Sequence, residues 1–149
     1  MNEICPGCGT QWRDGITCEA HFHQMLYWEH ENPANWEVHH LMVLCYHLQH
    51  PSLYAPDGLA TSKNLLVTFV DGGVSPQEVR VQSRDIVDSG KRKFKITATP
   101  DLHGAYANPI RWSMTTADVI DAGIDGYIDS GYAWAKSTLE ALKSSGNLD

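Results

Sequence analysis

The stretch CEAHFHQMLYWEHENPANWEVHHLMVLCYHLQHP, residues 18–51, decides the fold. Its first half places apolar residues at helical spacing. Asn32 can cap a helix, Pro33 suits the first position of the next helix, and Pro51 ends that second helix. Because the connection is so short, the two helices should run antiparallel, and we predict a helical hairpin over 18–50.

Helical patterns also dominate the chain beyond the hairpin. Capping, turn and spacing signals predict helices over 61–70, from 75 to about 88, from Thr115 or Thr116 through 120, and over 125–143, with a short strand near 93–98. In the last helix the apolar positions repeat at four, three, four and three, which predicts a core-facing stripe. Its members are Ile128, Tyr132, Ala135, Leu139 and Leu142. The prediction is a mainly α, helical bundle-like single domain over 1–149, with 1–17 as a zinc knuckle loop and 59–149 holding the remaining helices.

Composition and charge narrow the classes of function. The chain of 149 residues is 42% hydrophobic, with 18 acidic and 11 basic residues and a net charge of -7. Because nucleic-acid affinity depends on neutralising phosphates, this charge argues against a nucleic-acid partner. The basic run 91–95 is the local exception, and such a run is typically a solvated edge. Apolar runs are too short to span a bilayer, and no export signal precedes the first motif, so we expect a cytoplasmic protein without a membrane partner.

Cysteine and histidine are concentrated at one end of the chain. All four cysteines, and every histidine except His103, lie in the first 50 residues. Cys5 and Cys8 form a Cys-Pro-Gly-Cys turn that can point two thiolates at one tetrahedral ion, and Cys18 is the natural third ligand. A redox CxxC normally follows a strand, for which the first four residues leave no room, so the spacing favours zinc.

The fourth ligand has three candidates. His21 lies one helical turn after Cys18, so it completes the pattern locally. The hairpin offers two others, because its second helix returns to the knuckle and brings His47 and His50 there. His39 lies about 16 Å from His50 along the helix and cannot share the ion with it.

Three motifs resemble an uncharacterised family of small bacterial proteins that begin with a CPxCG knuckle. They are Cys5-Pro-Gly-Cys8-Gly9 followed by Cys18-x-x-x-Phe22; Trp36-x-x-His39-x-Leu41-x-Val43-x-x-Tyr46-x-Leu48-Gln49-His50-Pro51; and Met114-Thr115-Thr116-Ala117-Asp118-Val119. The resemblance marks Cys5, Cys8, Cys18, His39 and His50, and it leaves His21 unmarked. It implies a domain and a site but no reaction. The chain departs from the family pattern at Leu44 and Cys45, where an acidic or polar pair is common, so it lacks an acidic residue at these two positions.

Two functions compete on these observations. With metal ligands Cys5, Cys8, Cys18 and His50, zinc has no open position, so it is structural and the chain acts by binding an unknown protein or small-molecule partner. The alternative is a metal-dependent hydrolase that uses Glu29 and His39 inside the hairpin, because facing helices can build a metal site from inward Glu and His. A zinc module for DNA or RNA is disfavoured, since 1–20 carries a single basic residue.

Overall fold

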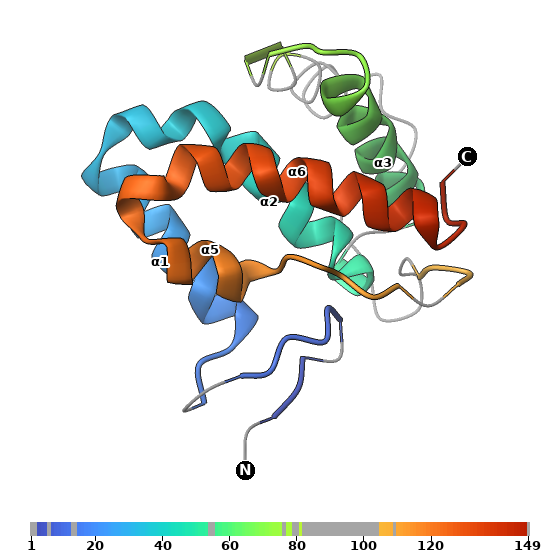
Figure 1. Cartoon of the computed structure of the whole chain (residues 1–149), viewed down its shortest axis with the longest axis horizontal. Coiled ribbons are helices and arrows are strands. Elements are labelled where there is room, and N and C mark those ends of the chain that lie inside the picture. The colour runs from blue at the N-terminus through green and yellow to red at the C-terminus, as the bar shows by residue number, and fades with distance from the viewer. Residues whose placement is uncertain are drawn as a thin grey trace.

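The computed structural model describes residues 3–5, 7–12, 15–53, 56–75, 77–78, 81, 105–108 and 110–148. The helices in this part of the chain are α1 (Cys18–Glu31), α2 (His39–Leu48), α3 (Pro56–Val70), α5 (Thr116–Ala122) and α6 (Tyr127–Ser144). Short 3-10 turns are η1 (Pro33–Val38), η2 (Pro51–Leu53) and η3 (Ile124–Gly126). No strand occurs among these residues, and the mainly α prediction is confirmed (Figure 1).

Helix α1 has the bounds that its sequence predicts. The Thr17 side chain accepts a hydrogen bond from the Ala20 amide and so caps the first turn. At the other end, Asn32 terminates α1, and its side chain accepts from the Ala34 amide to start the next turn. A small polar residue at each boundary satisfies amides that a helix leaves unpaired.

The second arm of the hairpin differs from the single helix that we expected. Its first six residues form the 3-10 turn η1, and α2 begins only at His39. Tertiary contacts hold this turn: the Asn35 side chain donates to the Trp28 carbonyl, and Val38 packs so closely on Gly131 that a Cβ there would lie 2.8 Å from Val38 Cβ. Local propensity is a weak guide where such contacts decide.

Helix α6 crosses the face of α2 in Figure 1 and packs on both α2 and α3. The predicted stripe is correct at Ala135, Leu139 and Leu142, which are buried. It is wrong at Tyr132, which is exposed, because the buried face runs instead through Tyr127 and other residues of α6. Those others are Ser130, Gly131, Trp134, Thr138 and Ala141.

Helix α3 begins at Pro56, five residues before the predicted start at 61. The Pro56-Asp57-Gly58 run resembles a loop, but Pro also suits the first position of a helix. Further along, the Ser75 hydroxyl accepts from the Glu78 amide, as the capping signature predicts. Residues 77, 78 and 81 of that fourth helix are helical. Its other residues after 78, the strand near 93–98, the basic run 91–95 and His103 lie outside the described residues.

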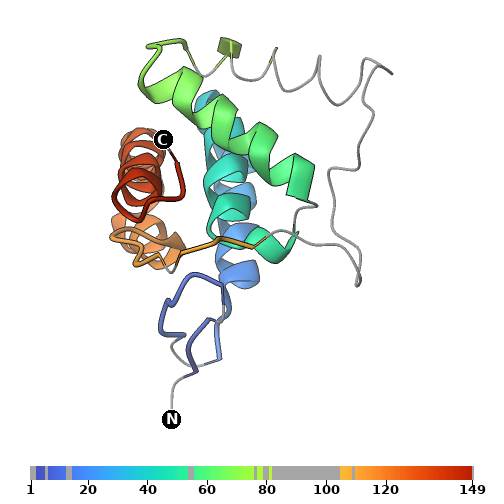
Figure 2. The ribbon, with the colours of Figure 1, turned by 90° about the vertical axis from the view of Figure 1, so that its right-hand side faces the viewer.

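The N-terminal segment lies at one end of the helices, beside the start of α1 (Figure 2). An antiparallel bridge joins Ile4 to Gln11 and folds this segment back on itself. The segment therefore lies where the start of α1 and the end of α2 meet. Among the described residues, no helix combines the length and the apolar character needed to cross a membrane.

Candidate metal centre

The knuckle is a tight backbone turn. The Cys5 amide donates to the Thr10 carbonyl at 2.8 Å, and the Gly9 amide donates to the Cys5 carbonyl at 3.0 Å. Gly9 has a φ of 80°, a left-handed conformation that glycine adopts without steric cost. The turn therefore brings Cys5 and Cys8 to the same side of the loop.

Four donor side chains converge at the end of the hairpin. The ligand atoms of Cys5, Cys8, Cys18 and His50 all lie within 4.8 Å of one another, and all four residues are buried. Two come from the knuckle, one from the first position of α1, and one from the turn after α2. They are positioned to bind a metal ion, because a tetrahedral site with bonds of 2.0–2.3 Å keeps its donors about 3.5–4 Å apart.

The sulfur atoms of Cys8 and Cys18 lie close together and form hydrogen bonds. Cys8 Sγ and Cys18 Sγ are 3.5 Å apart, and Trp12 Nε1 donates to Cys18 Sγ at 3.3 Å. The hydrogen bond from Cys8, with a smaller contribution from Trp12, outweighs burial and lowers the pKa of Cys18 to about 3. The same bond raises the pKa of Cys8. Two sulfurs that share one proton form a pair from which a divalent cation can displace that proton.

His50 presents one ring nitrogen to this centre. Its Nδ1–H donates to the Tyr46 carbonyl at 2.6 Å, which fixes the tautomer and leaves a lone pair on Nε2. Nε2 is buried and has no hydrogen-bond partner among the described residues. Gly7 lies against the ring, and a Cβ there would be 2.8 Å from His50 Cδ2. Such an orphaned nitrogen in a close cradle fits a metal ligand.

The other two candidates for the fourth ligand lie outside the cluster. His21 Nδ1 pairs with Thr116 Oγ1 at 2.9 Å. His47 is half-buried, and burial followed by the neighbouring His50 lowers its pKa to about 4. Cys45 is also separate from the cluster, and burial raises the pKa of its thiol to about 12.

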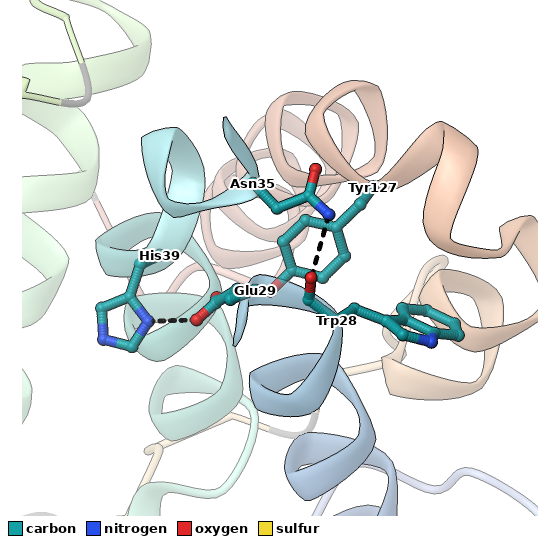
Figure 3. A network of polar contacts seen from close by, with 5 residues as sticks. All are labelled: Trp28, Glu29, Asn35, His39 and Tyr127. Atoms are coloured by element: carbon teal, nitrogen blue, oxygen red, sulfur yellow. Dashed lines mark hydrogen bonds and ion pairs between the residues drawn. The ribbon is translucent and has the colours of Figure 1, made fainter. Parts of the chain in front are cut away.

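Glu29 and His39 meet elsewhere in the hairpin, as the antiparallel geometry predicts. His39 Nδ1 lies 2.7 Å from Glu29 Oε2 (Figure 3). The Tyr127 hydroxyl donates to Glu29 Oε1 at 2.5 Å. Both carboxylate oxygens are thus engaged, and Glu29 is 1% exposed. Within the described residues, Glu29 and His39 belong to no group of three or more metal-binding side chains.

The sequence does not predict the hydrogen bonds that two residues near these sites make. Trp12 lies between the second and third cysteines, and its spacing gives no sign of a hydrogen bond to sulfur. Tyr127 is 98 residues from Glu29. A tyrosine on the buried face of a helix whose partner is unknown carries no local signal, so only the packing of α6 reveals it.

Fold and site together define a class: a helical protein whose N-terminal segment carries three cysteines that converge with one histidine from the hairpin. The chain belongs to the Family of unknown function (DUF5946), whose model matches residues 3–143. This agrees with the expected uncharacterised family. Comparison with curated proteins and with solved structures gave no match.

Proposed function

We propose that Cys5, Cys8, Cys18 and His50 bind one zinc ion and that this zinc is structural. The observation that carries the proposal is the buried His50 Nε2, which has no hydrogen-bond partner among the described residues, on a ring whose ligand nitrogen lies within 4.8 Å of three cysteine sulfurs. Thiolate and imidazole are the ligands that zinc prefers in structural sites. The four donors fill a tetrahedral shell, which leaves no position for a catalytic water.

The zinc would connect parts of the chain that share little other structure. It joins the knuckle, which has one isolated bridge, to the start of α1 and the turn after α2. Small metal-bound segments of this kind gain their folding free energy from the ion. We place the protein in the reducing cytoplasm, where thiols stay available for metal, and infer that it acts by binding a protein or a small molecule.

Elemental analysis of the purified chain tests this assignment, with an expected content of about one zinc per chain. His50→Gln should lower zinc affinity and the melting temperature, because the site loses a ligand. His47→Gln is the matched control, since it changes the same residue type three positions away and should leave both unchanged. Wild-type zinc affinity in the His50→Gln chain would refute the ligand assignment.

A second candidate is an enzyme that uses His39, and one observation favours it. The hydrogen bond to Glu29 holds His39 Nδ1, while the other ring nitrogen points away from Glu29 (Figure 3). Carboxylate–histidine pairs of this kind orient general bases and metal ligands. A metal-dependent hydrolase predicts a second ion per chain that is lost in His39→Gln, so a content of one ion in both chains would eliminate it.

A further inference from the structure

A cavity of about 360 Å³ opens at the metal centre and includes the position that the ion would occupy. Cys5, Cys18 and His50 form part of its wall, together with Trp12 and Tyr46. Its volume far exceeds that of a single ion and is in the range of small-molecule sites. Cys5 and Cys18 are only 4% and 3% exposed to bulk solvent, but both line this cavity, which extends beyond the position of a single ion.

The three cysteines differ in how their sulfurs are protected. Cys8 is absent from the cavity wall, and its Sγ lies 3.1 Å from the Thr10 hydroxyl, which can donate to a thiolate. Cys18 lies on the wall, but Trp12 Nε1 donates to its sulfur. Cys5 also lies on the wall, and no hydrogen bond reaches its sulfur from the described residues.

A hydrogen bond to a thiolate withdraws electron density and stabilises the anion, so it reduces nucleophilicity. Zinc keeps all three sulfurs deprotonated at neutral pH. Toward a molecule in the cavity, the strongest nucleophile is therefore the sulfur that lies on the cavity wall and has no donor among the described residues. By both criteria this sulfur belongs to Cys5.

We propose that Cys5 is an alkyl-acceptor site, at which the zinc-bound thiolate attacks a small, soft carbon electrophile that enters the cavity. This rests on the proposed zinc site. A sulfur lone pair forms the new S–C bond, the bond from carbon to the leaving group breaks, and the leaving group departs with the electron pair. No proton moves and no redox partner is needed. The product is a thioether, so the centre loses one negative charge.

Charge selects which electrophiles enter. Zinc with three thiolates and a neutral imidazole carries a net charge of about -1, and Glu19, which also lines the cavity, adds a carboxylate. The aromatic rings of Trp12 and Tyr46 favour cations over anions. The substrate class is therefore a neutral or cationic alkyl donor, and anionic donors are repelled.

Alkylation of the zinc-loaded full chain by iodoacetamide and by iodoacetate tests both the preference for Cys5 and the charge selectivity of the cavity. The two reagents match in size and differ in charge. Peptide mass spectrometry should find Cys5 labelled at least about tenfold faster than Cys8 or Cys18. The amide-to-acid rate ratio at Cys5 should exceed that of free cysteine in the same buffer, and Glu19→Gln should reduce it. Trp12→Phe keeps an aromatic ring but removes the N–H donor, so labelling of Cys18 should rise toward that of Cys5.

Equal labelling of the three sulfurs, or labelling of Cys8 or Cys18 first, would overturn the proposal. An amide-to-acid ratio equal to that of free cysteine would overturn its charge selectivity. Zinc content measured before alkylation distinguishes a failure of the proposed zinc site from a failure of the proposed Cys5 reactivity. A chain that holds no zinc refutes the proposed function and this inference with it, whereas a chain that holds zinc without a preference for Cys5 refutes only this inference.

Discussion

Removal of the Tyr127 hydroxyl tests whether a buried charged network stabilises the hairpin. Glu29 is 1% exposed and Tyr127 is fully buried, so water cannot replace the lost donor at Glu29 Oε1. A hydrogen bond to a charged group contributes about 1.5–3 kcal/mol, and a buried acceptor left without a partner costs a similar amount. We expect Tyr127→Phe to lower the free energy of unfolding by about 2 kcal/mol, which corresponds to about 4–8 °C in melting temperature.

Urea denaturation followed by circular dichroism, with zinc held constant, measures this change. Tyr132→Phe is the control, because it alters the same residue type on the same helix at an exposed position, and it should cost less than about 0.5 kcal/mol. The double variant Glu29→Leu with Tyr127→Phe removes both partners, and its cost should fall below the sum of the single changes by about 1–2 kcal/mol. Strict additivity, or a Tyr127 cost no larger than that of Tyr132, would refute the network as a source of stability.

Three further changes test the packing around the metal centre and the hairpin. Gly7→Ala should weaken zinc binding about tenfold, measured against a chromophoric chelator, because the new Cβ would lie 2.8 Å from His50 Cδ2; unchanged affinity would contradict the cradle. Gly131→Ala should lower the free energy of unfolding by about 1 kcal/mol despite its gain in helix propensity, and adding Val38→Ala should relieve the clash. Cys45→Ala should leave the zinc content unchanged, because Cys45 lies outside the cluster; a loss of zinc would show that the cluster is incomplete.

Much of the candidate site follows from the sequence because its signals are local or depend on simple helix geometry. The Cys5-Pro-Gly-Cys8 turn is a contiguous motif, and Asn32-Pro33 sets the point at which the hairpin turns. Counting residues back from that point brings both His47 and His50 to the region of Cys18, and the structure places His50 with Cys18. The same counting places Leu26 opposite His39 and Glu29 one turn further along, and the structure places Glu29 Oε2 2.7 Å from His39 Nδ1.

The missed features depend on contacts between distant segments. The 3-10 form of η1 depends on Val38 meeting Gly131, and the position of the buried face of α6 depends on what α2 and α3 present to it. Tyr132 fits an apolar repeat, yet it is exposed, while the polar Thr138 is fully buried beside Gln49. Periodicity alone cannot predict which of these positions is buried, since a hydroxyl is buried in the core only where a hydrogen-bond partner is available.

The convergence of Cys5, Cys8, Cys18 and His50 has a consequence for how the protein responds to its surroundings. An ion that binds only the folded chain adds stability that grows with the logarithm of its free concentration. Each tenfold rise in free zinc above the dissociation constant would therefore add about 1.4 kcal/mol to the free energy of unfolding. The attachment of the N-terminal segment to the helices would then follow the zinc status of the cell, tight when the ion is abundant and loose when it is scarce.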